Sequence, residues 1–221
     1  MGSGLWVLGS VVPDLLLMPS AITISNLVKH YDDVVAVDGI SLEVEAGEVF
    51  ALLGPNGAGK STTVEILEGH RTATSGDVSV LGFDPATRNR AYRERIGIVL
   101  QETAVEDALT VAEAISIYGA MYPRQRPTAE LIEIVGLEEK ADSRVKALSG
   151  GQRRRLELAL GIVGDPDLIF MDEPTTGFDP SARRQAWSII QNLTSLGKTV
   201  LLTTHYMEEA QVLADRVAVI S

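Results

Sequence analysis

Apolar and polar residues alternate in several short segments near the start of the chain. The alternation runs through residues 22–24 and 40–44, where isoleucine, leucine and valine occupy every second position. This spacing is typical of half-buried antiparallel strands, because successive side chains of a strand point to opposite faces. The segment Asp77–Leu81 continues the alternation. Together these segments predict an antiparallel β unit on the N-terminal side.

Four other runs are almost entirely apolar and are bounded by Gly, Asp or His. They are Val49–Leu53, Leu168–Met171, Val200–Leu202 and Val217–Ile220. Continuous apolar runs of this length indicate strands that are buried on both faces, as in a parallel sheet. Stretches with helical patterning lie between them, at Lys60–Leu67, Arg153–Val163 and Ala182–Leu196. The alternation predicts an α/β fold whose mostly parallel sheet is covered by helices on both faces.

The segment from about Val105 to Ala147 interrupts this alternation. Its apolar residues recur at helical spacing, at Val111, Ala114, Ile115 and Tyr118, and again at Leu131, Ile134 and Val135. Such spacing predicts amphipathic helices. We therefore expect a small helical insert, and we expect it to move relative to the core.

Composition narrows the class of protein. The chain has 221 residues, of which 45% are hydrophobic, which is enough for one large domain with a real core. Its formal net charge of -11 disfavours a broadly basic nucleic-acid face, and no direct nucleic-acid partner is expected. There is no cysteine, which excludes disulfides and thiolate metal sites and fits a reducing cytosol.

The first residues are the most apolar part of the chain. Pro13 and Asp14 break this stretch into pieces that are too short to span a bilayer. The first 28 residues contain neither Lys nor Arg, with which a secretory signal normally begins. The favoured interpretation of residues 1–21 is an N-terminal extension, which can be disordered, and the alternative is an anchor at a membrane interface.

A glycine-rich loop directly follows the first apolar run and directly precedes a helix. Its pattern is that of a phosphate-binding loop, whose glycines let backbone N–H groups turn inward around an anion. Lys60 would reach the β- and γ-phosphates, and Ser61 would offer a hydroxyl to magnesium. The predicted nucleotide contacts of this loop are Gly54, Pro55, Asn56, Gly57, Ala58, Gly59, Lys60, Ser61 and Thr62.

Two carboxylates, Asp172 and Glu173, end the second apolar run. Ligands of α/β sheets bind at the carboxyl ends of the strands, so these side chains are expected at the site. Asp172 would hold magnesium through water, and Glu173 would act as general base or orient the attacking water. The phosphate loop alone is shared by kinases, GTPases and motor ATPases, so it identifies only a nucleotide-binding class.

A third motif narrows that class. Leu148-Ser149-Gly150-Gly151-Gln152, followed by Arg153-Arg154-Arg155-Leu156, resembles the signature of ATP-binding-cassette proteins. Ser149, Gly150, Gly151 and Gln152 would form a second anion site at a helix start. The resemblance implies a RecA-like P-loop NTPase core of residues 22–101 and 148–221 that includes an antiparallel β subdomain. It also implies an α-helical subdomain at 102–147.

The resemblance further implies that two copies pair head to tail, so that the signature of each copy covers the ATP of the other. Tyr31 resembles the aromatic residue that stacks on adenine, and Gln101 resembles the glutamine that senses magnesium and water. His205 resembles the histidine that contacts the γ-phosphate. The implied catalytic residues are thus Glu173, His205, Gln101 and Lys60, and the implied magnesium contacts are Ser61, Gln101 and Asp172.

Residues 176–179 occupy the place of the loop that links the two active sites across the pair, although Leu is commoner there than Phe178. The resemblance covers residues 22–221, and the tail from Thr204 to Arg216 is most similar to ATPase subunits of bacterial drug exporters of the daunorubicin-resistance type. Family members normally continue past residue 220, so the end at Ser221 is interpreted as a C-terminal truncation.

This similarity implies an ATPase that energises export of a drug-like or lipophilic substrate through a separate transmembrane permease, at the cytoplasmic face of the membrane. Two alternatives remain open. One is a soluble switch of the same family that acts on ribosomes, nucleic acid or a repair complex. The other is a cassette that only binds ATP. The run Arg153–Arg155 is interpreted as a solvated helix face rather than a nucleic-acid contact.

Overall fold

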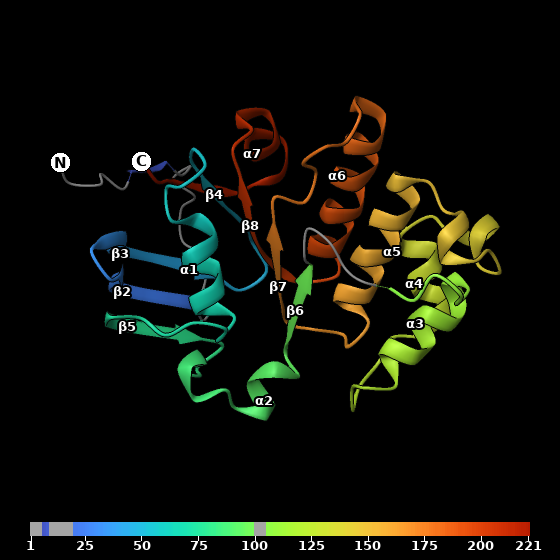
Figure 1. The fold of residues 1–221 in the computed structure, drawn as a ribbon, viewed down its shortest axis with the longest axis horizontal. Coiled ribbons are helices and arrows are strands. Elements are labelled where there is room, and N and C mark those ends of the chain that lie inside the picture. The colour runs from blue at the N-terminus through green and yellow to red at the C-terminus, as the bar shows by residue number, and fades with distance from the viewer. Residues whose placement is uncertain (1–5, 9–19, 100–104) are drawn as a thin grey trace.

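The computed structural model describes residues 6–8, 20–99 and 105–221, in which helices flank two β-sheets (Figure 1). The larger sheet has the strand order β1-β9-β4-β8-β7-β6. Its strands are Trp6–Leu8 (β1), Val49–Leu53 (β4), Ile96–Val99 (β6), Leu168–Asp172 (β7), Thr199–Thr204 (β8) and Arg216–Val219 (β9). Strands β4, β6, β7, β8 and β9 pair in parallel, so the four apolar runs are confirmed as parallel strands.

Two strands of this sheet were not predicted. β6 is only four residues long, and Gly97 interrupts its apolar pattern. This glycine is needed because a Cβ at Gly97 would lie 2.1 Å from the carbonyl oxygen of Gly161 on the covering helix. β1 lies within the segment 1–21 and pairs antiparallel with β9, with Trp6 opposite Val219.

The smaller sheet is the antiparallel unit that the early alternation predicts. Its strands are Ser20–Tyr31 (β2), Val34–Glu45 (β3) and Ser75–Val80 (β5), in the order β3-β2-β5. Both pairs are antiparallel. The alternating residues Ile22, Ile24 and Leu42 are buried and pack against Phe50 and Leu52 of the larger sheet, so the two sheets share a core.

Four helices cover the larger sheet, namely Lys60–Leu67 (α1), Gly150–Ile162 (α5), Pro180–Ser195 (α6) and Met207–Leu213 (α7). The predicted ranges of α1, α5 and α6 are confirmed to within three residues at each end. Alternate residues of β4 face two different clusters: Val49 and Ala51 pack in the same cluster as residues of α5 and α6, whereas Phe50 and Leu52 pack in the cluster of α1. Both faces of the sheet are therefore covered.

The helical insert contains Val111–Gly119 (α3) and Thr128–Ile134 (α4), followed by the short 3-10 helices Glu138–Lys140 (η2) and Val145–Ala147 (η3). Its buried residues, such as Ile115 and Leu131, pack with Leu156 of α5. Figure 1 shows α3 and α4 on one side of the larger sheet and the antiparallel sheet on the opposite side. A 3-10 helix, Pro85–Thr87 (η1), and the single turn Arg90–Arg93 (α2) lead into β6.

Among the helices of the described residues, none is both long and apolar enough to span a lipid bilayer.

Candidate functional site

The phosphate loop joins the end of β4 to the start of α1, as predicted. Gly59, the residue before α1, has a φ of 90°, a value in the left-handed region that favours glycine. A Cβ at Gly59 would also lie 2.3 Å from the carbonyl oxygen of Ala36. The loop conformation therefore depends on glycine at this position.

Lys60 lies inside this loop and is only 4% exposed. Its Nζ donates hydrogen bonds to the carbonyl oxygens of Gly54 at 2.8 Å and Pro55 at 3.1 Å. It also lies 3.6 Å from Oε1 of Glu173. A buried ammonium must be paired, because an isolated charge is costly to remove from water. The loop carbonyls and Glu173 provide that pairing.

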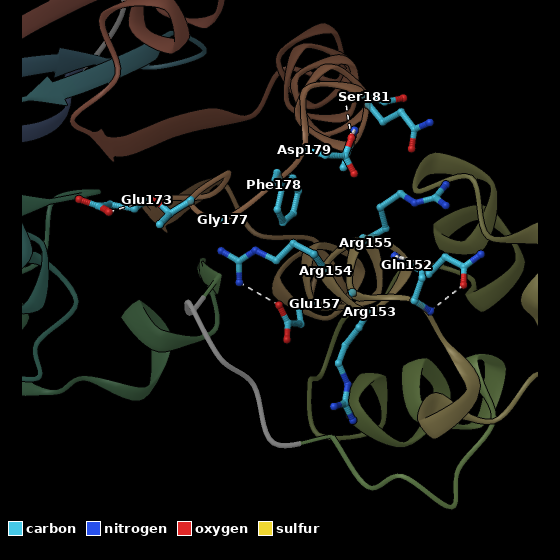
Figure 2. A pocket seen from close by; sticks show the side chains of 16 residues that line it. Gln152, Arg153, Arg154, Arg155, Glu157, Glu173, Gly177, Phe178, Asp179 and Ser181 are labelled. Atoms are coloured by element: carbon cyan, nitrogen blue, oxygen red, sulfur yellow. Dashed lines mark hydrogen bonds and ion pairs between the residues drawn. The ribbon is translucent and has the colours of Figure 1, made fainter.

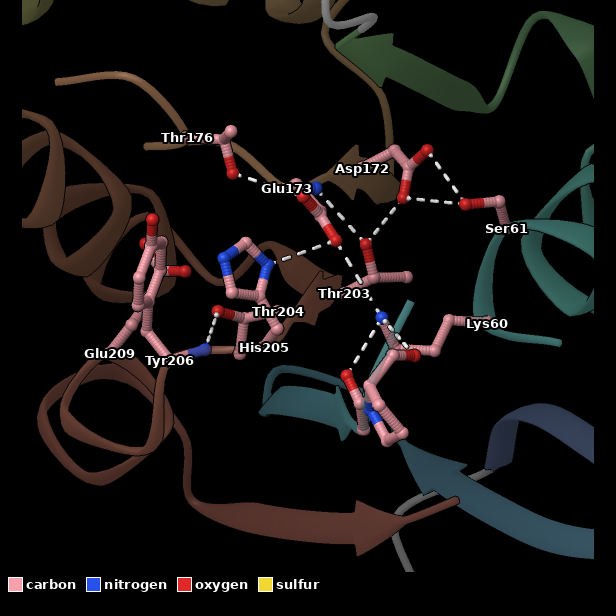
Figure 3. Close-up of polar contacts among 12 residues, drawn as sticks. Lys60, Ser61, Asp172, Glu173, Thr176, Thr203, Thr204, His205, Tyr206 and Glu209 are labelled. Atoms are coloured by element: carbon pink, nitrogen blue, oxygen red, sulfur yellow. Dashed lines mark hydrogen bonds and ion pairs between the residues drawn. The ribbon is translucent and has the colours of Figure 1, made fainter. Parts of the chain in front are cut away.

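Ser61 and Asp172 come together from two different elements, as the sequence predicts. The Ser61 hydroxyl donates to Asp172, with Oγ at 3.1 Å from Oδ2 and 3.3 Å from Oδ1 (Figure 3). Thr203 of β8 also donates its hydroxyl to Asp172 and accepts the backbone N–H of Glu173 at 3.0 Å. Two hydroxyl groups and one carboxylate thus meet at the carboxyl ends of the strands, and such oxygen groups are the ligands that magnesium prefers.

Glu173 is the point at which the polar side chains of the site converge (Figure 3). Its Oε1 lies 3.2 Å from Nδ1 of His205, and its Oε2 accepts a hydrogen bond of 3.0 Å from the hydroxyl of Thr176. Its backbone φ is 47°, in the left-handed region that is costly for a residue with a side chain. The surrounding contacts must hold this conformation.

The environment of Glu173 favours its ionised form. Burial alone would raise the pKa of this carboxyl. The contacts with His205 and Thr176, together with the charge of Lys60, outweigh burial and lower the pKa below its ordinary value. Glu173 is therefore a carboxylate at neutral pH, which is the form that can accept a proton or orient a water molecule.

Thr203 is a site residue that sequence reasoning missed. It links Asp172 to the backbone of Glu173, as described above. The available signal was a buried hydroxyl residue at the end of an otherwise apolar strand, directly before Thr204 and His205. The predicted strand ended at Leu202, so this polar position was left out.

Tyr31 ends β2, on the smaller sheet, and its ring has cationic neighbours. Nζ of Lys29 lies 4.8 Å from the ring centroid, and the guanidinium carbon of Arg71 lies 5.4 Å from it. Arg71 forms an ion pair with Glu65 of α1. The ring is thus connected to the helix that begins at the phosphate loop.

The signature residues form the start of α5. Ser149 caps this helix: its hydroxyl accepts the backbone N–H of Gln152 at 3.3 Å, and the Gln152 side chain accepts the N–H of Ser149 at 3.0 Å. This reciprocal pair is a capping box, which explains Ser and Gln at a spacing of three. A Cβ at Gly150 would meet no atom within 4 Å, so the surface above this residue is open.

A cavity of about 1040 Å³ lies beside the signature (Figure 2). One side is lined by Ser149 to Gln152, and the other by the loop that runs from Thr176 to Asp179, including Phe178. Glu173 also lines this cavity, but no residue of the described loop 54–61 does. Within one chain the signature and the phosphate loop are therefore separate half-sites.

Two predictions concern the rest of the site. Gln101 lies outside the described residues, so its role stays a prediction. The interpretation of Arg153–Arg155 as a solvated face is wrong for Arg154, which is only 6% exposed. Its guanidinium is buried because it pairs with Glu157, three residues along the same helix. The sequence of three arginines does not show that the side chain of the middle one, Arg154, is the one that is buried.

The known proteins to which this chain is similar agree with the motifs. The family model described as "ABC transporter" matches residues 37–176. The chain is 44% identical over 205 residues to the Nod factor export ATP-binding protein I of Rhizobium meliloti, with 90% of this chain and 61% of that protein covered. It is 46% identical over 205 residues to the daunorubicin/doxorubicin resistance ATP-binding protein of Streptomyces peucetius, with 90% and 62% covered.

A third relative, a Nod factor export ATP-binding protein I of Burkholderia lata, is 44% identical over 209 residues, with 92% of this chain and 69% of that protein covered. The chain thus spans 61% to 69% of the length of these three relatives.

Solved structures show the same arrangement. An ATP-binding cassette of an ABC transporter in its ADP conformation superposes with a TM-score of 0.79 at 25% identity, covering 91% of this chain and 87% of that one. A dimeric bacterial ABC transporter cassette superposes with a TM-score of 0.75 at 25% identity, covering 87% of this chain and 91% of that one.

Proposed function

This chain belongs to the ABC transporter family, and from that premise we propose that it binds and hydrolyses ATP with magnesium to power a membrane exporter. The observation that carries this proposal is the convergence of Lys60, Ser61, Asp172, Glu173 and His205 at the carboxyl ends of β4, β7 and β8. These groups have the chemistry that phosphoryl transfer requires, namely positioning and charge neutralisation.

The phosphate groups of ATP would lie on the loop 54–62, at the amino end of α1. Lys60 would exchange its contacts with the carbonyls of Gly54 and Pro55 for contacts with phosphate oxygens. Ser61 and Asp172 would hold magnesium, with Gln101 as the further expected contact. The metal ion would supply neutralisation of phosphate charge.

Glu173 is proposed as the group that orients the attacking water molecule and accepts its proton. Its lowered pKa keeps it ionised at neutral pH, and its neighbours His205 and Thr176 fix its orientation. His205 is proposed to contact the γ-phosphate, and Tyr31 to stack on adenine. Each of these roles is the one that the sequence motifs predict.

Two copies are proposed to assemble head to tail around ATP. The signature residues support this arrangement, because they line an open cavity and no residue of the phosphate loop 54–61 lines it. A second chain would bring its own phosphate loop to this surface. Ser149 and the N–H groups at the start of α5 would then contact the nucleotide held by that second chain.

The proposed membrane partner is a separate transmembrane permease, which would hold the chain at the cytoplasmic face of the membrane. A cavity of about 430 Å³ supports this assignment, because Ile96 and Ile98 of β6 and Tyr122 of the helical insert all line it. A segment bound there would contact both parts of the chain and would respond to movement between them.

The relatives are named for export of Nod factor and for resistance to daunorubicin and doxorubicin. Their names favour an exporter over a soluble switch, and we infer a drug-like or lipophilic substrate for this chain.

Glu173→Gln tests the proposed reaction. The variant should bind ATP within about 3-fold of the wild-type affinity, because no phosphate contact is removed, and should lose on the order of 10³-fold in kcat. Phosphate release measures turnover, and calorimetry with ATP measures affinity. Glu133→Gln, at an exposed position of the helical insert, is the matched control and should turn over normally. Wild-type turnover by Glu173→Gln would contradict the assigned role.

A further inference from the structure

Arg154 and Glu157 form a buried ion pair that the proposed reaction does not use. Both lie on α5, and their side chains are only 7% exposed. Nη1 of Arg154 donates to Oε2 of Glu157 at 2.8 Å (Figure 2). A buried ion pair of this kind is weak evidence for stability, since apolar residues of similar size often stabilise a protein equally well. A role other than stability would account for this pair.

A further contact of Arg154, made through its Nε, indicates such a role. Its Nε donates a buried hydrogen bond of 3.2 Å to the carbonyl oxygen of Pro174. Pro174 directly follows Glu173 in the sequence, twenty residues away from Arg154. The guanidinium group therefore connects the helix of the signature to the peptide next to the carboxylate at the centre of the site.

The backbone at this point needs such support. Glu173 has a φ of 47°, which is costly for a residue with a side chain and persists only where neighbouring contacts enforce it. Pro174 has no N–H group, so its carbonyl is the polar backbone group through which this residue can be held. Arg154 binds that carbonyl.

Arginine suits this position better than lysine. A guanidinium presents several N–H donors in a rigid planar arrangement, so Arg154 can contact Glu157 and the Pro174 carbonyl simultaneously from different nitrogens. A lysine ammonium carries its charge on a single nitrogen. At this position it could not contact both Glu157 and the Pro174 carbonyl as the guanidinium does.

We propose that Arg154 is a positioning residue for Glu173 and mechanically links the signature half-site to the hydrolytic carboxylate of the same chain. The inference rests on the proposed function. Ser149 caps the start of α5 and Arg154 lies five residues further on, so a shift of this helix on contact with a second chain would reach Glu173 through the Pro174 carbonyl. One site of the pair would thereby adjust the carboxylate of the other.

The test is Arg154→Lys in the full chain, with phosphate release measured over a range of ATP concentrations. We expect kcat to fall by about 10-fold or more, because small displacements of a reacting group are costly to rate. The KM for ATP should remain within about 2-fold, since Arg154 lies away from the phosphate loop. A purely structural role would instead change the melting temperature and leave kcat per folded molecule unaltered.

The control is Arg126→Lys. Arg126 also binds two partners, Asp165 and Glu130, with a side chain that is 15% exposed, but it lies outside the site. This variant should reduce the melting temperature by a similar amount and keep the wild-type kcat. A second control is Arg154→Met with Glu157→Leu, which removes both buried charges and restores apolar packing. It should fold and still show the low kcat.

Glu173→Gln with Arg154→Lys completes the experiment. If Arg154 acts through Glu173, the double variant should be no slower than Glu173→Gln alone, because residues that act as one unit are not additive. Independent, multiplicative losses, or a wild-type kcat for Arg154→Lys, would overturn the positioning role. A wild-type chain without ATP hydrolysis would instead overturn the proposed function itself, so the two failures are distinguishable.

Discussion

The two half-sites differ in how complete each is within a single chain. In the phosphate loop the side chain of Lys60 is buried and contacts Gly54, Pro55 and Glu173 of its own chain. The signature is open, because Ser149 to Gln152 line a cavity of about 1040 Å³ and Gly150 has no atom near the place where a Cβ would lie.

This difference indicates which contacts determine the residues of each half-site. The phosphate loop is constrained from inside the chain at Gly54, Gly59 and Lys60, since a Cβ at either glycine would lie 2.3 Å from a backbone carbonyl oxygen and the lysine is bonded to the loop. The signature is constrained only weakly from inside, so its small residues are best explained by a surface that approaches from outside. The first half-site is organised within the chain, and the second is open on the side where the proposed second chain would bind.

Alanine substitutions at one glycine of each half-site give the largest expected contrast. Gly59→Ala places a Cβ 2.3 Å from the Ala36 carbonyl oxygen at a φ of 90°, and should destabilise the fold by about 2 kcal/mol or more. That loss corresponds to a fall of roughly 4–8 °C in melting temperature. Gly150→Ala meets no atom and should melt within about 2 °C of the wild type.

Both glycine variants should nevertheless lose ATP hydrolysis, the first because the loop is distorted and the second because the added methyl group meets the second chain. Thermal unfolding without nucleotide, combined with phosphate release, measures the two effects separately. Equal melting temperatures for the two variants would contradict the claim that the phosphate loop is packed against its own chain and the signature is not.

An effect that depends on pH is expected from Glu68, the residue that directly follows α1. Burial, together with the negative charges of Asp172 and Glu65, raises the pKa of Glu68 to about 8. The folded protein therefore binds a proton more tightly than the unfolded chain does. The resulting stability is fully present below the ordinary pKa of about 4.5 and is lost as the pH rises through 8.

Glu68→Gln should remove this pH dependence. Its melting temperature, measured with a metal chelator present, should exceed that of the wild type at pH 9 and differ little at pH 5. Glu133→Gln, which replaces an exposed carboxylate, should follow the wild type at both pH values. A difference that is constant across this pH range would show that the charge of Glu68 is not the cause.

Sequence patterns predicted the parts of the fold that have a strong period or a fixed motif. Strand β4 and helix α1 match the predicted ranges, and Ser61 and Asp172 meet as expected, because both follow directly from the order of strand, loop and helix. Strand β6 was missed because Gly97, which its close contact with α5 requires, breaks a run of only four residues.

The orientation of individual polar side chains was harder to predict. Arg154 differs from its two arginine neighbours in the direction in which it leaves the helix, and its contact with the carbonyl of Pro174, twenty residues away, depends on tertiary packing. Thr203 likewise acquires its role from Asp172, which ends the neighbouring strand, and from Glu173, which directly follows it. Such roles depend on contacts between elements, which a local pattern does not encode.

The central claim is that each complete site is shared by two chains, and mixing two inactive variants tests it most directly. Lys60→Ala removes the phosphate-binding ammonium but keeps the signature, whereas Ser149→Arg keeps the phosphate loop and blocks the signature surface. Each variant alone should show about 1% or less of wild-type ATP hydrolysis, since neither forms a complete site.

An equimolar mixture should form mixed pairs that each contain one complete site, made from the phosphate loop of one variant and the signature of the other. Random pairing predicts recovery of up to about a quarter of the wild-type phosphate release rate. A mixture that hydrolyses ATP no faster than the average of the two separate variants would contradict the shared site.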